Sequence, residues 1–119
     1  MTLDDYFTGL ETSRRVFEAL AEAVGRLGDV DVRITKTQVA FRRRVGFAYA
    51  WVPEKHLGRP AAPLVLTVAL RRRDDSPRWK EVVEPAKGRF THHLELHQTD
   101  EVDEDVVGWL REAWLTSDG

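Results

Sequence analysis

Two runs of three consecutive arginines are the residues of this sequence best suited to chemistry. Each run directly follows an apolar segment, residues 39–41 or 64–70, of a composition typical of a β-strand. The runs are Arg42, Arg43 and Arg44, then Arg71, Arg72 and Arg73. Like charges packed this closely repel one another, so they need water or an anion beside them. The chemistry that they offer is the binding of phosphate or carboxylate groups.

A single lysine is a second candidate for anion binding. Lys36 stands between Thr35 and Thr37, at the expected turn between the first two strands. Its ammonium group could hold an anion, with the two threonines and Gln38 as hydrogen-bond partners. The more common interpretation is an ordinary exposed turn lysine.

The histidine-rich strand near the C-terminus is the candidate for a metal site. His93, Glu95 and His97 are expected on one face of that strand. Neighbours two residues apart lie about 6.5–7 Å apart, so one ion could join His93 to Glu95, but His93 and His97 are about 13 Å apart. Zinc usually takes at least three protein ligands. A polar sheet face is therefore favoured, and we expect no metal and no cofactor.

No catalytic constellation stands out in the sequence. Ser13, Ser76 and Ser117 lie outside any Gly-x-Ser-x-Gly motif, and no glycine loop followed by Lys-Thr is present. The acidic residues 100–105 are interpreted as the start of a helix, where carboxylates favour the helix dipole. Because no nucleophile–base pair can be named, we expect a protein that is not an enzyme.

Composition predicts one globular domain over residues 1–119. The chain has 119 residues, 42% of them hydrophobic, and no cysteine, which excludes disulfides and thiol chemistry. No apolar run follows the acidic N-terminus, and the longest one, residues 64–70, is far too short to span a membrane. A cytoplasmic protein with no membrane association is expected.

Charge is strongly segregated along the chain. Residues 1–35 carry a net charge of −3, residues 36–89 carry +8, and residues 90–119 carry −7, although the whole chain carries only −2. Such segregation creates a local field that the overall charge conceals.

Hydrophobic periodicity predicts the elements that position these residues. Residues 13–27 and 102–115 have helical spacing, and Trp109 is expected to be largely buried on the second helix. Five segments have the pattern of strands, residues 30–35, 38–43, 45–51, 64–70 and 90–97, and the segment between the last two is expected to be irregular. The predicted fold class is α+β, a five-stranded antiparallel sheet flanked by N- and C-terminal helices packed on one face. A sequential meander would gather both arginine runs, Lys87 and Arg89 at one end of the sheet and the acidic residues 100–105 at the other.

The order of these segments resembles a bacterial family known as domain-of-unknown-function family 5655. The resemblance is carried by residues 32–41 and 47–48, the Leu-x-Leu-x-Val strand, residues 91–96 and 102–105, and the segment 109–114. It implies a small α+β domain, loosely labelled a predicted transport protein. The resemblance implies no established activity, so it assigns no catalytic residue.

Together these features favour a small bacterial binding or accessory domain. The expected partner is anionic, a nucleotide, a nucleic acid or an acidic protein surface, and it would contact the arginine-rich end of the sheet. One alternative is a protein-interaction or self-association module, such as a homodimer that pairs its basic and acidic ends. The other is a small-molecule-binding domain with a site between sheet and helices.

Overall fold

The structure, a computed structural model, describes residues 1–57 and 61–117. These residues form an α+β fold around a six-stranded antiparallel sheet with the strand order β1-β2-β3-β4-β6-β5. The strands are β1 (Asp31–Ile34), β2 (Val39–Arg43), β3 (Val45–Trp51), β4 (Leu64–Leu70), β5 (Glu81–Ala86) and β6 (Arg89–Leu96). The helices are α1 (Leu3–Tyr6), α2 (Glu11–Gly25), α3 (Glu54–Leu57), the 3-10 turn η1 (Thr99–Glu101) and α4 (Glu104–Leu115).

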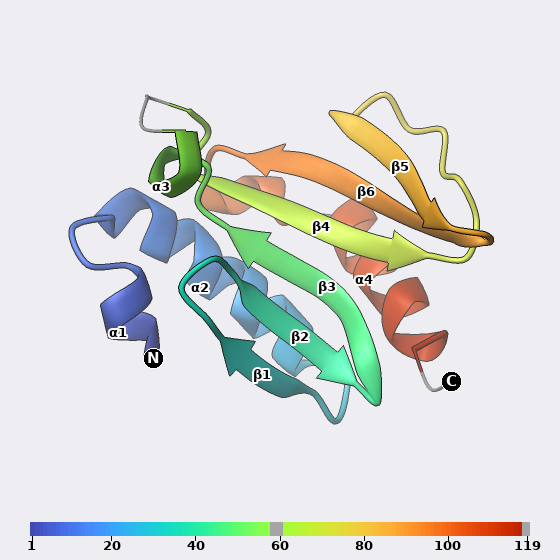
Figure 1. Cartoon of the computed structure of the whole chain (residues 1–119), viewed down its shortest axis with the longest axis horizontal. Coiled ribbons are helices and arrows are strands. Elements are labelled where there is room, and N and C mark those ends of the chain that lie inside the picture. The colour runs from blue at the N-terminus through green and yellow to red at the C-terminus, as the bar shows by residue number, and fades with distance from the viewer. Residues whose placement is uncertain (58–60, 118–119) are drawn as a thin grey trace.

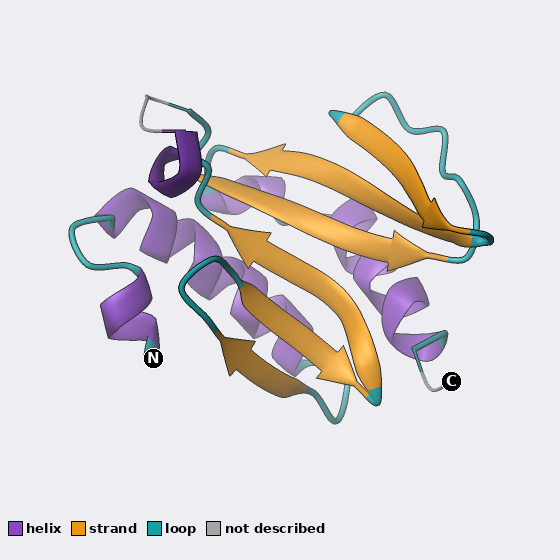
Figure 2. Cartoon of the chain, viewed as in Figure 1, coloured by secondary structure: helices purple, strands orange, loops and turns teal. Residues whose placement is uncertain are grey.

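The two long helices cover one face of the sheet, as predicted. Figure 1 shows α2 and α4 behind the strands, and Figure 2 shows that the face toward the viewer has strands without a long helix in front of them. The core lies between sheet and helices and contains Phe17, Leu20, Phe41, Leu66 and Leu110, all at most 1% exposed. The chain therefore presents one sheet face on which side chains remain accessible.

The prediction of five strands was wrong, because β5 lies in the segment expected to be irregular. Its sequence contains Pro85, which lacks a backbone N–H and is tolerated only where a strand forms an edge of the sheet. β5 is such an edge, and its pairing with β6 shifts register between Val83 and Ala86. Val82 is the one half-buried residue of the strand, so the alternation that marks a strand is almost absent.

The helix limits differ from prediction by about half a turn. α2 begins at Glu11, two residues earlier than expected, and its N-cap residue Leu10 makes no side-chain hydrogen bond. α4 begins at Glu104, after Asp103, whose carboxylate accepts the backbone N–H of Val106 at 3.2 Å. Val102, the predicted first residue of the closing helix, is instead the residue that follows the 3-10 turn η1.

Trp79 and Trp109 pack against each other at the margin of the core. Trp109 on α4 is partly buried and packs against the core, whereas Trp79 is 8% exposed. The ring centroid of Trp79 lies 4.2 Å from that of Trp109 and 4.9 Å from that of His92. The loop tryptophan thus closes the core over β6.

Candidate functional site

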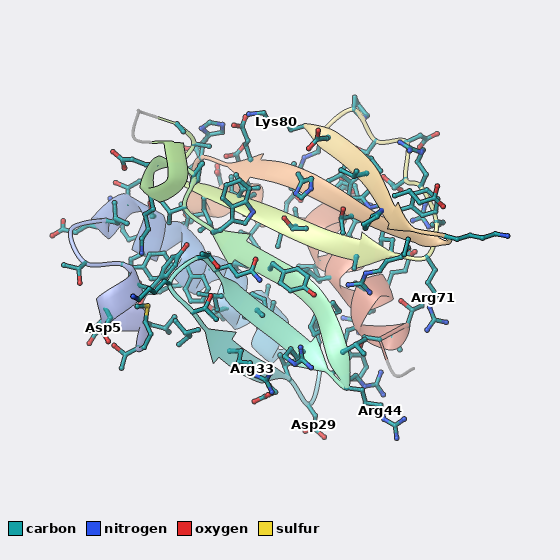
Figure 3. The ribbon with its side chains drawn as sticks, viewed as in Figure 1. Asp5, Asp29, Arg33, Arg44, Arg71 and Lys80 are labelled. Carbon is teal, nitrogen blue, oxygen red and sulfur yellow. The ribbon has the colours of Figure 1, made fainter. Side chains whose placement is uncertain are left out.

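The antiparallel strand order brings both arginine runs to the same end of the sheet. β2 ends at Arg43, β4 ends at Leu70, and β6 begins beside it, because Leu70 pairs with Phe90. We call this place the arginine end. It comprises Arg42, Arg43, Arg44, Arg71, Arg72, Arg73, Lys87 and Arg89. Figure 3 shows Arg44 and Arg71 directed outward there.

Lys36 does not belong to the arginine end. It is exposed in the connection between β1 and β2, at the opposite end of β2 from the arginines. The Thr35 hydroxyl oxygen accepts the backbone N–H groups of Thr37 and Gln38, both at 3.3 Å. The threonine expected to help bind an anion therefore holds the turn in place.

Arg72 is neutralised within the chain. Its Nε and Nη2 atoms donate to the two carboxylate oxygens of Glu112, both at 2.8 Å, and Nη1 donates to Asp74 at 2.9 Å. These bonds, above all those to Glu112, raise the pKa of Arg72 further above its ordinary value. Burial alone would raise the pKa of Asp74, but hydrogen bonds from Trp79, Ser76 and Arg72 hold it below the ordinary value. Arg72 thus joins α4 to the segment after β4.

Arg43 and Arg71 bind the C-terminal end of α4. The guanidinium carbon of Arg43 lies 3.9 Å from the ring centroid of Trp114, and Arg43 Nη1 donates to the Trp114 carbonyl oxygen at 3.0 Å. Arg71 donates to the carbonyl oxygen of Thr116 at 2.5 Å. The last carbonyl groups of a helix lack partners within the helix and carry partial negative charge. The arginines add to the hydrogen bonds that Ser117 donates to the Trp114 carbonyl oxygen, and contacts to carbonyl groups leave the guanidinium charge uncompensated.

The other cations lie around these two. Arg42 donates to the carbonyl oxygen of Arg44 at 3.4 Å, and Arg89 donates to that of Gly46 at 3.3 Å. Arg73 is exposed, with its guanidinium carbon 5.6 Å from the ring centroid of Phe90. Arg44 forms the tight turn between β2 and β3, with a φ of 65°. Four arginines of this end thus donate to main-chain carbonyl oxygens, namely Arg42, Arg43, Arg71 and Arg89.

A hollow of about 300 Å³ lies among these side chains. Its lining includes Gly46, Arg71, Gly88, Arg89, Thr116 and Ser117. A Cβ at Gly88 would meet no atom within 4 Å, whereas a Cβ at Gly46 would collide with the Tyr49 hydroxyl group. Two guanidinium groups thus border a cavity that the end of α4 partly covers.

The histidine strand is arranged for hydrogen bonding within the sheet. His93 Nδ1 lies 2.8 Å from Thr67 Oγ1, Glu95 accepts from Lys80 Nζ at 3.0 Å, and His97 lies exposed just beyond β6. In the described part of the chain, no three His, Cys, Asp or Glu side chains are placed to hold a metal ion. The side chains of His93 and Glu95 thus have partners other than a metal ion.

Sequence reasoning missed the residues that engage the arginines, Glu112, Trp114 and Thr116. The sequence does contain a signal for these contacts, because the closing helix starts at the end of the sheet opposite the arginines, beside the acidic residues 100–105. Twelve helical residues extend about 18 Å, close to the length of a seven-residue strand. The end of this helix therefore had to return to the arginines.

Comparison with known proteins identifies the family of this chain. A family model described as a domain of unknown function, DUF5655, matches residues 3–117. No curated protein and no solved structure shows a significant match. Within the described residues, no helix has the length and apolar character needed to cross a membrane.

Proposed function

Since the chain belongs to the DUF5655 family, a domain of unknown function, we propose its role from its own surface: it is a non-enzymatic binding domain whose arginine end holds an extended phosphate polyanion. A nucleic-acid strand is the ligand class that fits this description. The contacts would be made to phosphates, so binding would depend little on base sequence.

Uncompensated charge is the observation that carries the proposal. Arg72 has two carboxylate partners, and its charge is neutralised. Arg43, Arg71 and Arg89 donate instead to main-chain carbonyl oxygens, which carry no full negative charge. Guanidinium groups have five N–H donors, so each of these arginines keeps donors for a ligand. The field at this end of the sheet is therefore positive although the chain as a whole is slightly acidic.

The spacing of the cations favours an extended ligand over a single phosphate. Arg44 lies at the β2–β3 turn, Arg71 at the end of β4, and Lys87 at the β5–β6 turn. Three strand spacings separate the two turns, which gives roughly 15 Å. One phosphate group cannot contact charges spread so widely, whereas successive phosphates along a strand can.

The test is binding of fluorescently labelled single-stranded oligothymidylate, followed by anisotropy between about 50 and about 200 mM salt. The wild type should bind, and its affinity should fall steeply with salt. Arg44→Gly with Arg73→Ala should weaken binding and reduce the salt slope by about one to two units. Arg15→Ala with Lys36→Ala is the matched control, because it removes two exposed cations far from the arginine end.

Three results would contradict the proposal. Equal loss in both double variants would mean that only net charge matters, and absence of binding would remove the proposal outright. If polyglutamate displaces the oligonucleotide at equal charge concentration, the partner is an acidic polypeptide. Sedimentation without ligand separates these cases from head-to-tail self-association, which depends on protein concentration.

A small-molecule function is a second candidate, because a hollow of about 300 Å³ lies between α2 and β1. Its lining is mostly apolar and includes Phe17, Val24, Val30 and Phe41. A ligand there would raise the melting temperature with little effect of salt. Thermal shift with apolar ligands at two salt concentrations distinguishes this function from polyanion binding.

A further inference from the structure

A second site lies on the sheet face that the long helices leave open. It is a hollow of about 310 Å³ over β3, β4, β6 and the start of β5. We call it the open-face hollow. Its lining includes Trp51, Val65, Lys80, Glu81, His93 and Glu95. Figure 3 shows Lys80 at the start of β5, well away from Arg71, so this hollow is separate from the arginine end.

A chain of hydrogen bonds fixes the imidazole in this hollow. Trp51 Nε1 donates to Thr67 Oγ1 at 3.3 Å, and Thr67 Oγ1 lies 2.8 Å from His93 Nδ1. Because the indole nitrogen can only donate, the Thr67 hydroxyl hydrogen is available for Nδ1. A neutral His93 ring that accepts this hydrogen carries its own proton on Nε2. Burial lowers the pKa of His93 despite the nearby Glu81 carboxylate, which agrees with a neutral ring.

The second ring nitrogen of His93 faces accessible space. Within the described residues it has no hydrogen-bond partner, and no buried side-chain nitrogen or oxygen atom there lacks one. Nε2 must therefore be accessible, and His93 lines the open-face hollow. It offers a donor of fixed direction to whatever occupies that space.

The charges around the hollow favour a cation. Glu81 lies directly opposite His93 in the register of β5 and β6, and the described residues give it no ion pair or hydrogen bond. Glu95 is paired with Lys80 at 3.0 Å. With His93 neutral, two carboxylates and one ammonium leave the hollow with a net negative charge. The Lys80 side chain is 66% exposed, so this ion pair with Glu95 lies at the solvent-facing side of the hollow.

We infer that the open-face hollow binds a small organic cation, a protonated amine carried on a flat apolar body. Glu81 holds the ammonium group, and the indole of Trp51 with Val65 contacts the apolar body. Aromatic walls favour cations placed over their faces, and small-ligand sites combine apolar walls with a few placed polar groups. His93 Nε2–H donates to an oxygen of the ligand where one is present.

Matched probes of opposite charge test this inference. Benzylamine, benzoate and benzyl alcohol share one ring and differ in charge. Proton–nitrogen correlation spectra report the Trp51 indole N–H and the His93 imidazole during each titration. Benzylamine should shift both groups with saturation, benzyl alcohol should shift them weakly, and benzoate should leave them unchanged.

Three variants sharpen the result. Glu81→Gln should weaken benzylamine binding about two- to fivefold, the range for an exposed ion pair. Glu18→Gln, an exposed carboxylate on α2, is the control and should have no effect. Lys80→Ala should strengthen binding, because it frees Glu95 from its internal cation.

Opposite outcomes would overturn the inference. These are benzoate binding as well as benzylamine, shifts centred on the arginine end, unchanged affinity in Glu81→Gln, or no saturable shift with any probe. The oligonucleotide experiment above uses other residues, so either proposal can fail without the other.

Discussion

The imidazole Nε2 of His92 accepts a hydrogen bond of 2.9 Å from the backbone N–H of Asp74. The other ring nitrogen lies 3.2 Å from the carbonyl oxygen of Phe90, so Nδ1 carries the proton and donates it. His92 is 0% exposed, and both of its nitrogens are used only when the ring is neutral. This contact attaches the segment after β4 to β6.

Acid should therefore destabilise the fold through His92. Burial lowers the pKa of His92 below its ordinary 6.5, with Arg72 acting in the same direction and Asp74 in the opposite one. Below about pH 6.5, His92 therefore binds a proton more readily in the unfolded chain than in the folded chain. The free energy of unfolding should then be constant with respect to His92 above about pH 6.5 and should fall as the pH drops below it. The pKa of Asp74 is itself below 3.8, so its contribution is lost only at lower pH. Urea unfolding at about pH 7.5 and about pH 5 measures the difference.

The matched variants for this prediction are His92→Gln and His93→Gln. Each should reduce the pH dependence, and His92→Gln should reduce it more, because His92 is 0% exposed and glutamine can bond without titrating. The second removes a histidine whose pKa is also lowered by burial but whose ring bonds to a hydroxyl group. An unchanged pH profile in His92→Gln would contradict the assignment.

Trp79 should contribute more to stability than Trp109. It is buried, its Nε1 donates to Asp74 at 2.8 Å, and its ring lies between Trp109 and His92. Trp79→Ala should lower the free energy of unfolding by roughly 3–5 kcal/mol. The loss in Trp109→Ala should be smaller than the loss in Trp79→Ala by about 1–3 kcal/mol. Chemical denaturation of the two variants gives the comparison, and a larger loss in Trp109→Ala would refute it.

Substitutions at Arg44 should rank by backbone preference. Its φ of 65° lies in the left-handed region, where a side chain costs about 1–2 kcal/mol and glycine costs none. Arg44→Gly should be more stable than Arg44→Ala by about 1 kcal/mol, and Arg44→Val should be the least stable. All three lack the guanidinium group, so melting temperatures isolate the backbone effect. Equal stability of the glycine and valine variants would exclude the strained turn.

Gly28→Ala should destabilise the chain for two reasons that can be separated. A Cβ at Gly28 would lie 2.5 Å from Trp114 Cζ2, and the φ of 141° is unfavourable for a side chain. The Trp114 indole also donates to the Asp29 carbonyl oxygen at 3.0 Å, so the ring cannot move freely. In a double-mutant cycle with Trp114→Leu, part of the Gly28→Ala penalty should disappear, and additive losses would exclude the contact.

Much of the fold followed from periodicity, because the buried strands and both long helices have strong patterns. Val39, Leu64, Leu66, Leu94 and Leu96 all occur in segments predicted as strands and are buried. Antiparallel order along the chain then placed the arginine runs together. Local pattern was sufficient where one face of an element is buried.

The sequence failed where tertiary contacts decide. β5 has little burial pattern of its own and pairs with β6 as an edge. Trp79 is buried by partners remote from it in sequence, Trp109 and His92. For the same reason, the pairing of Arg72 with Glu112 across 40 residues gave no local signal.

The two edge strands of the sheet, β1 and β5, prevent edge-to-edge association between molecules in different ways. An edge strand can template pairing with another chain, which leads to aggregation. β5 interrupts such a template, since Pro85 offers no N–H and the register breaks beside it. β1 is only four residues long and places Asp31 and Arg33 on either side of the exposed Val32. We therefore expect the sheet to resist fibrillar growth at both edges. At β5 the cause is the missing N–H of Pro85, and at β1 the causes are the short strand and its charged side chains.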